Sequence, residues 1–270
     1  MKMYPGNESL LQFDNLSGYS AIQHFCTTRK GGVSKGLFSS FNLGNFSDDS
    51  PMDIYENREI LSRMWYMEID DFIIPHQTHG NNVFVIDDAF MHLSQSDKIE
   101  ALYGVDATIT HRKDIFLCAT TADCAPILLY DNFKQIIAAI HAGWKGIVGG
   151  IIDNTISKMI ETYYSNPKDI IAAIGPSISQ ENYEVGEDLI NEFEKAGFDL
   201  SSASIINPVT SKHHIDLATI INNELVRLGV SHEHIETTSL CTYHCSDLFF
   251  SARRQSINCG RMLSGIKLVD

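Results

Sequence analysis

The sequence predicts an α/β (mixed α+β) fold, with a mixed β-sheet core packed against helices in a single domain over residues 1–270. Short apolar runs alternate along the chain with segments of helical periodicity, which is typical of sheets covered by helices. No internal repeat, low-complexity tract or long linker divides the chain. With 270 residues, 44% of them apolar, it can bury one substantial core.

The predicted strands are short apolar runs rich in β-forming residues and bounded by turn signals. They cover residues 21–27, 71–75, 83–86, 115–119, 125–130, 135–140 and 170–174. Four longer segments have helical periodicity. These predicted helices cover residues 52–67, 147–164, 187–195 and 216–228. Glycine and serine residues in 31–44 predict a long loop, and loops of that length in compact domains are often functional.

The charge balance excludes one class of partner. The chain has 34 acidic and 20 basic residues, a net charge of -14, which opposes approach to a phosphate backbone. We therefore expect no nucleic-acid partner. No stretch approaches the ~20 apolar residues that cross a bilayer, so we expect no membrane partner. The first fifteen residues lack the features of a signal peptide, and we expect a cytoplasmic protein whose six cysteines are thiols or metal ligands.

Three residues that bind metals well lie just beyond apolar runs. They are His79 in IIPHQTHGNNVFV, Cys124 in IFLCATTADCAPILLY and His141 in IIAAIHAGWKGIVGG. Residues at strand ends can converge on one edge of a sheet. Two imidazoles and one thiolate suit zinc, and three protein ligands leave the fourth position open, as a catalytic zinc requires. The alternative is that the histidines are buried polar groups satisfied by the backbone and that Cys124 is a small core residue.

A second metal candidate is CTYHC, which contains Cys241, His244 and Cys245. Its spacing lacks the usual two-residue gap, and no second compact pair is present to complete a structural zinc site. A strand-to-loop segment with incidental thiols is the favoured interpretation. His232 and His234 form the one HxH pair of the sequence, and we interpret them as exposed histidines near a helix.

Several segments are suited to an anion. In HAGWKGIVGG a strand runs through a glycine-rich turn into a helix, which presents free backbone N–H groups, and Lys145 adds a full charge. The same glycines equally suit tight packing of a helix on a strand. In so acidic a chain, concentrated basic loops point to an anionic substrate group, whereas the alternative is ordinary surface ion pairs. These loops contain Arg29, Lys30, Lys35, Arg253, Arg254 and Arg261.

The motifs together resemble one family. They are CTTRKGGVSKGLFSSFNLG, HQTHGNNV, GVDATIT, TADCAPILLYD, HAGWKGIVGGI, IGPSIS, FFSARR and GRM, and they extend from Cys26 to Met262. This combination resembles the purine nucleoside phosphorylase family that was formerly described as laccase-domain or multicopper polyphenol oxidase-like proteins. HAGW together with TADC is a highly specific pair. The resemblance therefore covers nearly the whole chain.

The resemblance implies a mixed α/β fold, a Zn²⁺ ion, and phosphorolysis of adenosine and inosine to ribose 1-phosphate and free base. It also implies phosphorolysis of methylthioadenosine and deamination of adenosine, so the expected partners are purine nucleosides and phosphate; a homodimer is left open. The family's zinc ligands fall on His79, Cys124 and His141. The chain departs from the family at Ala252, where an aromatic residue is usual, and at Gln255 with the following serine, where Asp-Gly is usual.

The residues also suggest how such a site would work. In phosphorolysis the anomeric carbon gains oxocarbenium character while phosphate attacks and the purine leaves. We expect Lys145 and Arg29 to position phosphate or ribose oxygens, and Asp123 to carry a proton or to orient its neighbour, the ligand Cys124. Copper-based phenol oxidation is excluded as the main activity, because multicopper oxidases need several HxH pairs and this chain has one among eleven histidines. The HxE and PCxxC pattern of cytidine-type deaminases is also missing.

Two other functions are alternatives. A cysteine hydrolase would use Cys124 as nucleophile and His141 as base on an amide such as a cell-wall precursor peptide. A non-catalytic module would use zinc to stabilise its fold while an acidic surface binds a partner. The three hypotheses differ in the effect of metal removal. A cysteine hydrolase would keep its activity in the presence of chelators. A protein whose zinc is structural would unfold when the metal is removed, whereas a catalytic zinc enzyme would lose activity but keep most of its structure.

Overall fold

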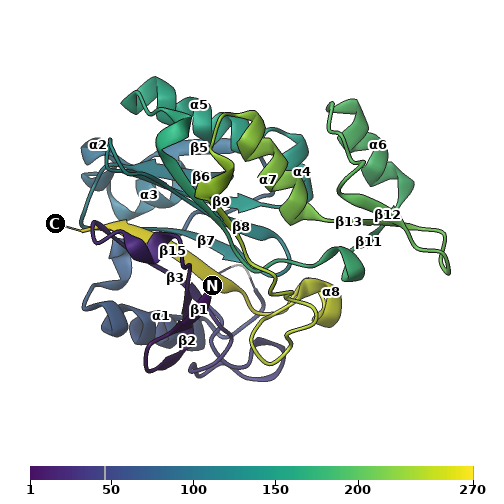
Figure 1. Cartoon of the computed structure of the whole chain (residues 1–270). Helices are drawn as coiled ribbons and strands as arrows, with labels where there is room; N and C mark the ends of the chain where they lie inside the picture. Colours follow the sequence, from purple (N-terminus) through teal and green to yellow (C-terminus); the bar gives the residue numbers. More distant parts are fainter. Residues whose placement is uncertain (46, 270) are drawn as a thin grey trace.

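Two six-stranded sheets form the centre of the molecule. The computed structural model describes residues 1–45 and 47–269, and it stacks the two sheets between outer helices (Figure 1). The first sheet has the order β1-β2-β3-β15-β7-β4. Its strands are β1 (Lys2–Tyr4), β2 (Asn7–Gln12), β3 (Ile22–Thr27), β15 (Met262–Leu268), β7 (Phe116–Thr121) and β4 (Phe72–Ile73).

The second sheet has the order β14-β10-β8-β9-β6-β5, with β8 antiparallel to both β9 and β10. Its strands are β14 (Ile235–Thr237), β10 (Ile170–Ile174), β8 (Ala125–Asp131), β9 (Ile136–Ala142), β6 (Val105–Thr110) and β5 (Asn82–Val85). A small third sheet stands at one side of the molecule with α6 (Figure 1). It contains β11 (Glu184–Val185), β13 (His213–Ile215) and β12 (Ser204–Ile206), and α6 spans Glu187–Lys195.

The remaining helices are α1 (Pro51–Trp65), α2 (Asp88–Met91), α3 (Gln95–Ala101), α4 (Trp144–Val148), α5 (Ile151–Tyr163), α7 (Leu217–Arg227) and α8 (Ala252–Gln255). Of these, α1 covers the outer face of the first sheet and α4, α5 and α7 cover that of the second, whereas α2 and α3 pack against the core between the sheets. Short 3₁₀ turns cover Leu16–Gly18, Gly36–Phe38, Ile69–Asp71, Pro167–Asp169, Gln180–Asn182 and His232–His234. The start of α1 is determined by local chemistry, because the Ser50 side chain accepts a hydrogen bond from the N–H of Asp53 and Pro51 occupies the first turn. None of the helices in the described residues is both long and apolar enough to span a bilayer.

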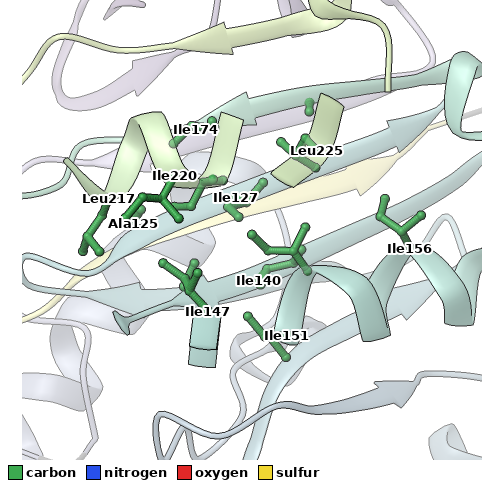
Figure 2. Close-up of a cluster of buried hydrophobic side chains, with 14 of the residues drawn as sticks. Ala125, Ile127, Ile140, Ile147, Ile151, Ile156, Ile174, Leu217, Ile220 and Leu225 are labelled. Atoms are coloured by element: carbon green, nitrogen blue, oxygen red, sulfur yellow. The ribbon is translucent and has the colours of Figure 1, made fainter. Parts of the chain in front are cut away.

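The central strands are apolar on both faces because each face meets a different layer. In β8, Ile127 and Leu129 pack against helices, whereas Leu128 and Tyr130 pack between the two sheets. Figure 2 shows the helix-facing cluster, in which Ile127 and residues of β9 and β10 lie beneath side chains of α4, α5 and α7. Alternation along one strand therefore joins the two cores, and the continuous apolar runs in the sequence follow from burial on both sides.

The outer face of the first sheet is covered by α1 through an aromatic cluster. Phe72 and Phe116 stack with ring centroids 5.1 Å apart, and the rings of Phe25 and Trp65 lie 5.2 and 5.0 Å from that of Phe116. Phe25 and Phe116 are completely buried. Aromatic pairs of this geometry add stabilisation beyond their buried area. They hold the first sheet against its helix and so fix the position of β7, which leads directly to Cys124.

The predicted fold class, a mixed sheet core with packed helices in a single domain, is confirmed. The predicted helix 187–195 and strand 170–174 coincide with α6 and β10. The single helix predicted over 147–164 is wrong, because the chain breaks it into α4 and α5 at Gly149 and Gly150. Gly150 has φ +83°, a left-handed conformation that ends one helix and that glycine adopts without steric cost. The sequence patterns also missed β6 and β15, two central strands.

Candidate metal centre

His79, Cys124 and His141 meet at the edge of the two sheets. Their ligand atoms all lie within 4.8 Å of one another. Within residues 1–45 and 47–269 this is the one group of three or more His, Cys, Asp or Glu side chains placed to share an ion. His79 lies on the connection from β4 to β5, Cys124 on the turn from β7 to β8, and His141 near the end of β9. The structure thus brings together residues that are separated by 45 and 17 positions in the sequence.

The group is closed on one side and open on the other. His141 is 3% exposed, Cys124 is partly buried, and His79 is exposed to solvent. The two imidazole rings are nearly perpendicular, at 81°, with centroids 4.7 Å apart. A structural zinc site surrounds its ion with four protein ligands, whereas a catalytic site offers three and leaves access for a substrate. The open side at His79 matches the second arrangement.

The backbone around the group is specialised. His79 has φ +61° and Asp123, which precedes Cys124, has φ +90°, both in the left-handed region that non-glycine residues seldom occupy. Gly143 packs against the same group. A Cβ at this position would lie 2.9 Å from Cys124 Sγ and 3.0 Å from His79 Cδ2. The glycine of HAGW is therefore required by close approach to the candidate ligands, and backbone strain of this kind is concentrated at functional sites.

Asp106 on β6 contacts the side chain of His141 and the backbone of His79. Its Oδ1 lies 2.7 Å from His141 Nδ1 and accepts a hydrogen bond from the N–H of His79 at 3.0 Å. Its Oδ2 accepts hydrogen bonds from the N–H groups of Thr78 and Gly80. A carboxylate on Nδ1 keeps that nitrogen protonated and leaves Nε2 as the ligand atom, which is the usual support of a metal-binding histidine. The sequence patterns did not identify this residue, although it is the one acidic residue of the otherwise uncharged run VDATIT.

The electrostatics of the group favour the metal-binding form of the thiol. Burial opposes ionisation of Cys124, but the charges and hydrogen bonds of His141 and His79 outweigh it and lower the pKa of the thiol below its ordinary range. Burial also opposes charge on His141, yet Cys124 and Asp106 raise its pKa above the ordinary value. A thiolate rather than a thiol is the form that binds zinc and the form that acts as a nucleophile.

Asp123 connects three segments of the chain. Its Oδ1 accepts a hydrogen bond from Thr242 Oγ1 at 2.6 Å, and its Oδ2 accepts from Ser251 Oγ at 3.0 Å and from the N–H of Arg253 at 2.7 Å. Both carboxylate oxygens are therefore occupied by donors from the C-terminal part of the chain. Of the two roles expected for Asp123, this arrangement favours orientation of the turn that carries Cys124 over proton transfer.

The two predicted cations differ in their surroundings. Arg29 donates from Nε to the carbonyl of Ser39 at 2.7 Å and from Nη1 to that of Ser246 at 3.1 Å, and its guanidinium lies 4.7 Å from the centre of the Phe250 ring. These contacts fasten the long loop to the C-terminal region, and none of them involves the candidate ligands. Lys145 is exposed on the short helix α4, with Nζ 5.6 Å from the Trp144 ring.

The CTYHC segment does not form a second centre in the described part of the chain. Cys241 Sγ accepts hydrogen bonds from the N–H of Ser179 at 3.3 Å and from Asn182 Nδ2 at 3.6 Å. His244 and Cys245 do not join it in a ligand group within residues 1–45 and 47–269. The favoured interpretation of this segment, a strand-to-loop connection with incidental thiols, agrees with these contacts.

The protein has a mixed α/β fold, and two imidazoles and a thiolate form a group that is open to solvent. These features define a candidate metal-dependent enzyme. The family is shown by the sequence. The chain belongs to the family described as multi-copper polyphenol oxidoreductase laccase, whose model matches residues 23–269.

Similar proteins carry names from purine nucleoside metabolism. A purine nucleoside phosphorylase of Bacteroides thetaiotaomicron is 42% identical over 97% of this chain and 97% of its own length. Adenosine deaminase RL5, from an unknown prokaryotic organism, is 36% identical over 95% of this chain and 98% of its own length. The crystal structure of YfiH from Bacillus licheniformis, a hypothetical protein, has a TM-score of 0.89 at 29% identity and covers 97% of both chains. The resemblance found in the sequence motifs is thereby confirmed.

Proposed function

We propose that this protein is a cytoplasmic, zinc-dependent purine nucleoside phosphorylase. It converts adenosine and inosine, with phosphate, to ribose 1-phosphate and free base, and it also phosphorolyses methylthioadenosine and deaminates adenosine. The observation that carries the proposal is the solvent-facing group of His79, Cys124 and His141. The names of the similar phosphorylase and deaminase support the substrate class.

The three side chains fit zinc by the chemistry of their donors. Imidazole nitrogen and thiolate sulfur are ligands that zinc prefers, whereas magnesium and calcium prefer oxygen. Asp106 prepares His141 by holding its Nδ1, and the lowered pKa of Cys124 provides a thiolate. When bound, zinc supplies a Lewis acid that polarises a substrate oxygen. The part of the chain that the structure describes holds one such ligand group, which supports a mononuclear centre rather than the multinuclear copper chemistry in the family's description.

We assign substrate binding and the positioning of the site to three further residues. Lys145 lies two positions beyond Gly143, whose backbone packs against Cys124 and His79, and we assign its ammonium to phosphate or ribose oxygens. Arg29 contributes by holding the loop over residues 31–44 in place. Asp123 keeps the turn before β8 in its left-handed conformation. Holding phosphate and nucleoside in a reactive geometry accounts for much of the rate that such an enzyme needs.

One observation favours a second candidate function. The lowered pKa of Cys124 beside His141 also suits a cysteine hydrolase that attacks an amide, such as a cell-wall precursor peptide. The convergence of His79 on the same point favours a metal instead, because a thiol nucleophile with one histidine base does not require a second imidazole. A non-catalytic zinc module fits less well, since its site would be closed to solvent.

Metal analysis combined with product chromatography tests the proposal. The purified protein is assayed with adenosine and inosine, with and without phosphate, before and after treatment with a zinc chelator. We expect zinc at about one ion per chain and ribose 1-phosphate formed only when phosphate and zinc are both present. Release of free base in the absence of both phosphate and zinc would overturn the proposal. Amidase activity that survives chelation but is abolished by iodoacetamide would establish the hydrolase.

A further inference from the structure

A second pair of side chains lies beside the candidate metal centre. The guanidinium carbon of Arg253, on α8, lies 5.2 Å from the centre of the Tyr183 ring. Tyr183 is the residue that precedes β11. Arg253 Nη1 donates to the carbonyl of Glu184 at 3.0 Å. Its backbone N–H donates to Asp123, the residue before Cys124. In Figure 1, α8 and β11 lie at the same end of the molecule, so segments distant in sequence converge beside the turn from β7 to β8.

Tyr183 is electrostatically coupled to the metal-binding group. Its pKa is raised above the ordinary value, first by burial and then by the negative charges of Cys124 and Asp123, while Arg253 acts in the opposite direction. The geometry agrees with this, because Arg253, which lies over the Tyr183 ring, donates its backbone N–H to Asp123, the residue before Cys124. Within residues 1–45 and 47–269 no protein group forms a hydrogen bond with the Tyr183 hydroxyl.

The arginines near the centre are not equivalent. Arg254 donates to the carbonyls of Thr242, Tyr243 and Phe249, and Arg29 donates to two other carbonyls. Both are occupied in joining loops. Arg253 is exposed, its guanidinium donates to a single carbonyl, and no carboxylate of the described residues lies within ion-pair distance of it. Its remaining N–H donors match the geometry of an oxyanion, which a guanidinium binds with two parallel hydrogen bonds.

We propose that Arg253 binds the phosphate that attacks the nucleoside, and that Tyr183 is the positioning residue that supports its guanidinium. This inference rests on the proposed phosphorylase function and gives Arg253 the phosphate contact that the sequence suggested for Arg29, while Lys145 remains assigned to ribose oxygens. A phosphate oxygen forms a bond to the anomeric carbon while the bond from that carbon to the purine nitrogen breaks. The electron pair of the broken bond stays on the purine, which takes up the proton of hydrogen phosphate. The products are ribose 1-phosphate and free base.

Steady-state kinetics of zinc-loaded variants tests the assignment. Arg253→Ala keeps the backbone N–H that donates to Asp123, so we expect it to fold and to retain zinc. We expect its KM for phosphate to rise more than tenfold, with the KM for inosine and the phosphate-independent deamination of adenosine unchanged. Tyr183→Leu should raise the KM for phosphate by a smaller factor. Tyr183→Phe should leave this KM close to the wild-type value, because phenylalanine keeps the ring under the guanidinium.

Arg63→Ala is the matched control, since Arg63 is an exposed arginine on α1, paired with Glu59 and remote from the site. An unchanged KM for phosphate in Arg253→Ala would overturn the inference, and so would equal losses in Tyr183→Phe and Tyr183→Leu. Calorimetric titration with inorganic phosphate separates the two proposals. If the wild-type protein forms no ribose 1-phosphate, the phosphorylase function fails. Phosphate binding that is present in the wild type and lost in Arg253→Ala would still establish the anion site.

Discussion

His141 Nδ1 lies 2.7 Å from Asp106 Oδ1, and the same carboxylate accepts hydrogen bonds from the N–H groups of Thr78, His79 and Gly80. One buried aspartate therefore orients a ligand on β9 and fixes the loop that carries another. This relationship predicts that the metal affinity of the protein depends on a residue that does not itself touch the ion.

Asp106→Asn should lower the zinc affinity about 10- to 100-fold, because the amide cannot reproduce the charge and the four accepted hydrogen bonds of the carboxylate. Competition with a chromophoric chelator measures this change. Asp131→Asn is the control, since Asp131 is equally buried but accepts its hydrogen bonds from Phe133 and Lys134, remote from the centre. Unchanged zinc affinity in Asp106→Asn would contradict the orienting role.

Cys124→Ala should remove zinc and phosphorolysis together. The substitution deletes the one thiolate of the group and leaves two imidazoles, which hold zinc far more weakly than three ligands do. Elemental analysis of the purified variant and chromatography of its products provide the measurements. Cys245→Ala serves as the control, because that thiol is partly exposed and lies outside the group. Retention of full activity in metal-free Cys124→Ala would refute the proposed mechanism.

Gly143→Ala should disturb the centre although it changes only one methyl group. The added Cβ would lie 2.9 Å from Cys124 Sγ, so the turn or the helix start must shift, at a cost of about 1–3 kcal/mol in unfolding free energy. Urea unfolding and zinc titration measure the two effects. Gly18→Ala is the matched control, since its Cβ meets nothing within 4 Å and its φ is not positive. Equal behaviour of the two variants would show that Gly143 is not constrained by the ligands.

The free energy of unfolding should decrease as the pH is lowered from about 6.5 to about 4, and protonation of His24 is one cause. Burial lowers the pKa of His24 to about 4, and its Nε2 accepts a hydrogen bond from the N–H of Phe13, which requires an unprotonated nitrogen. The unfolded chain takes up the proton near pH 6.5, before the native state does. The His24 contribution is therefore complete above pH 6.5 and diminishes below it, by on the order of 3 kcal/mol at pH 4.

His24→Gln tests this contribution, because the glutamine carbonyl can accept the same N–H but does not titrate. The unfolding free energy of the variant, measured in urea at several pH values, should change less between pH 6.5 and pH 4 than that of the wild type. Parallel pH profiles for the two proteins would exclude His24 as a source of the acid sensitivity.

Local patterns predicted the elements that are regular and deeply buried. The strand over residues 170–174 is an uninterrupted apolar run, and α6 has a clear helical period, so both were found with their observed bounds. In β6, Asp106 interrupts the apolar pattern because its side chain serves the metal-binding group. In β15, Gly265 replaces a larger side chain because a Cβ there would lie 2.7 Å from the ring of Phe25. These two strands therefore did not resemble the sheet core to which they belong.

The candidate ligands could be predicted because each of them follows an apolar run and is a residue type that zinc prefers. Their supporting residues could not, because those contacts depend on tertiary structure. Asp123 is hydrogen-bonded to residues 119 to 130 positions away. The partnership of Tyr183 with Arg253 likewise joins segments that no local pattern relates. The sequence thus identified the candidate centre, whereas the fold revealed what orients it.

The chain passes from the first large sheet to the second at two places described above, between β4 and β5 and between β7 and β8. His79 lies on one of these crossings and Cys124 on the other. An ion shared by them would tether both crossings, and its binding energy would add to the stability of the folded state by mass action. The zinc supply would then affect the lifetime of the folded protein as well as its activity. Proteases would cleave the zinc-free protein faster than the zinc-bound protein.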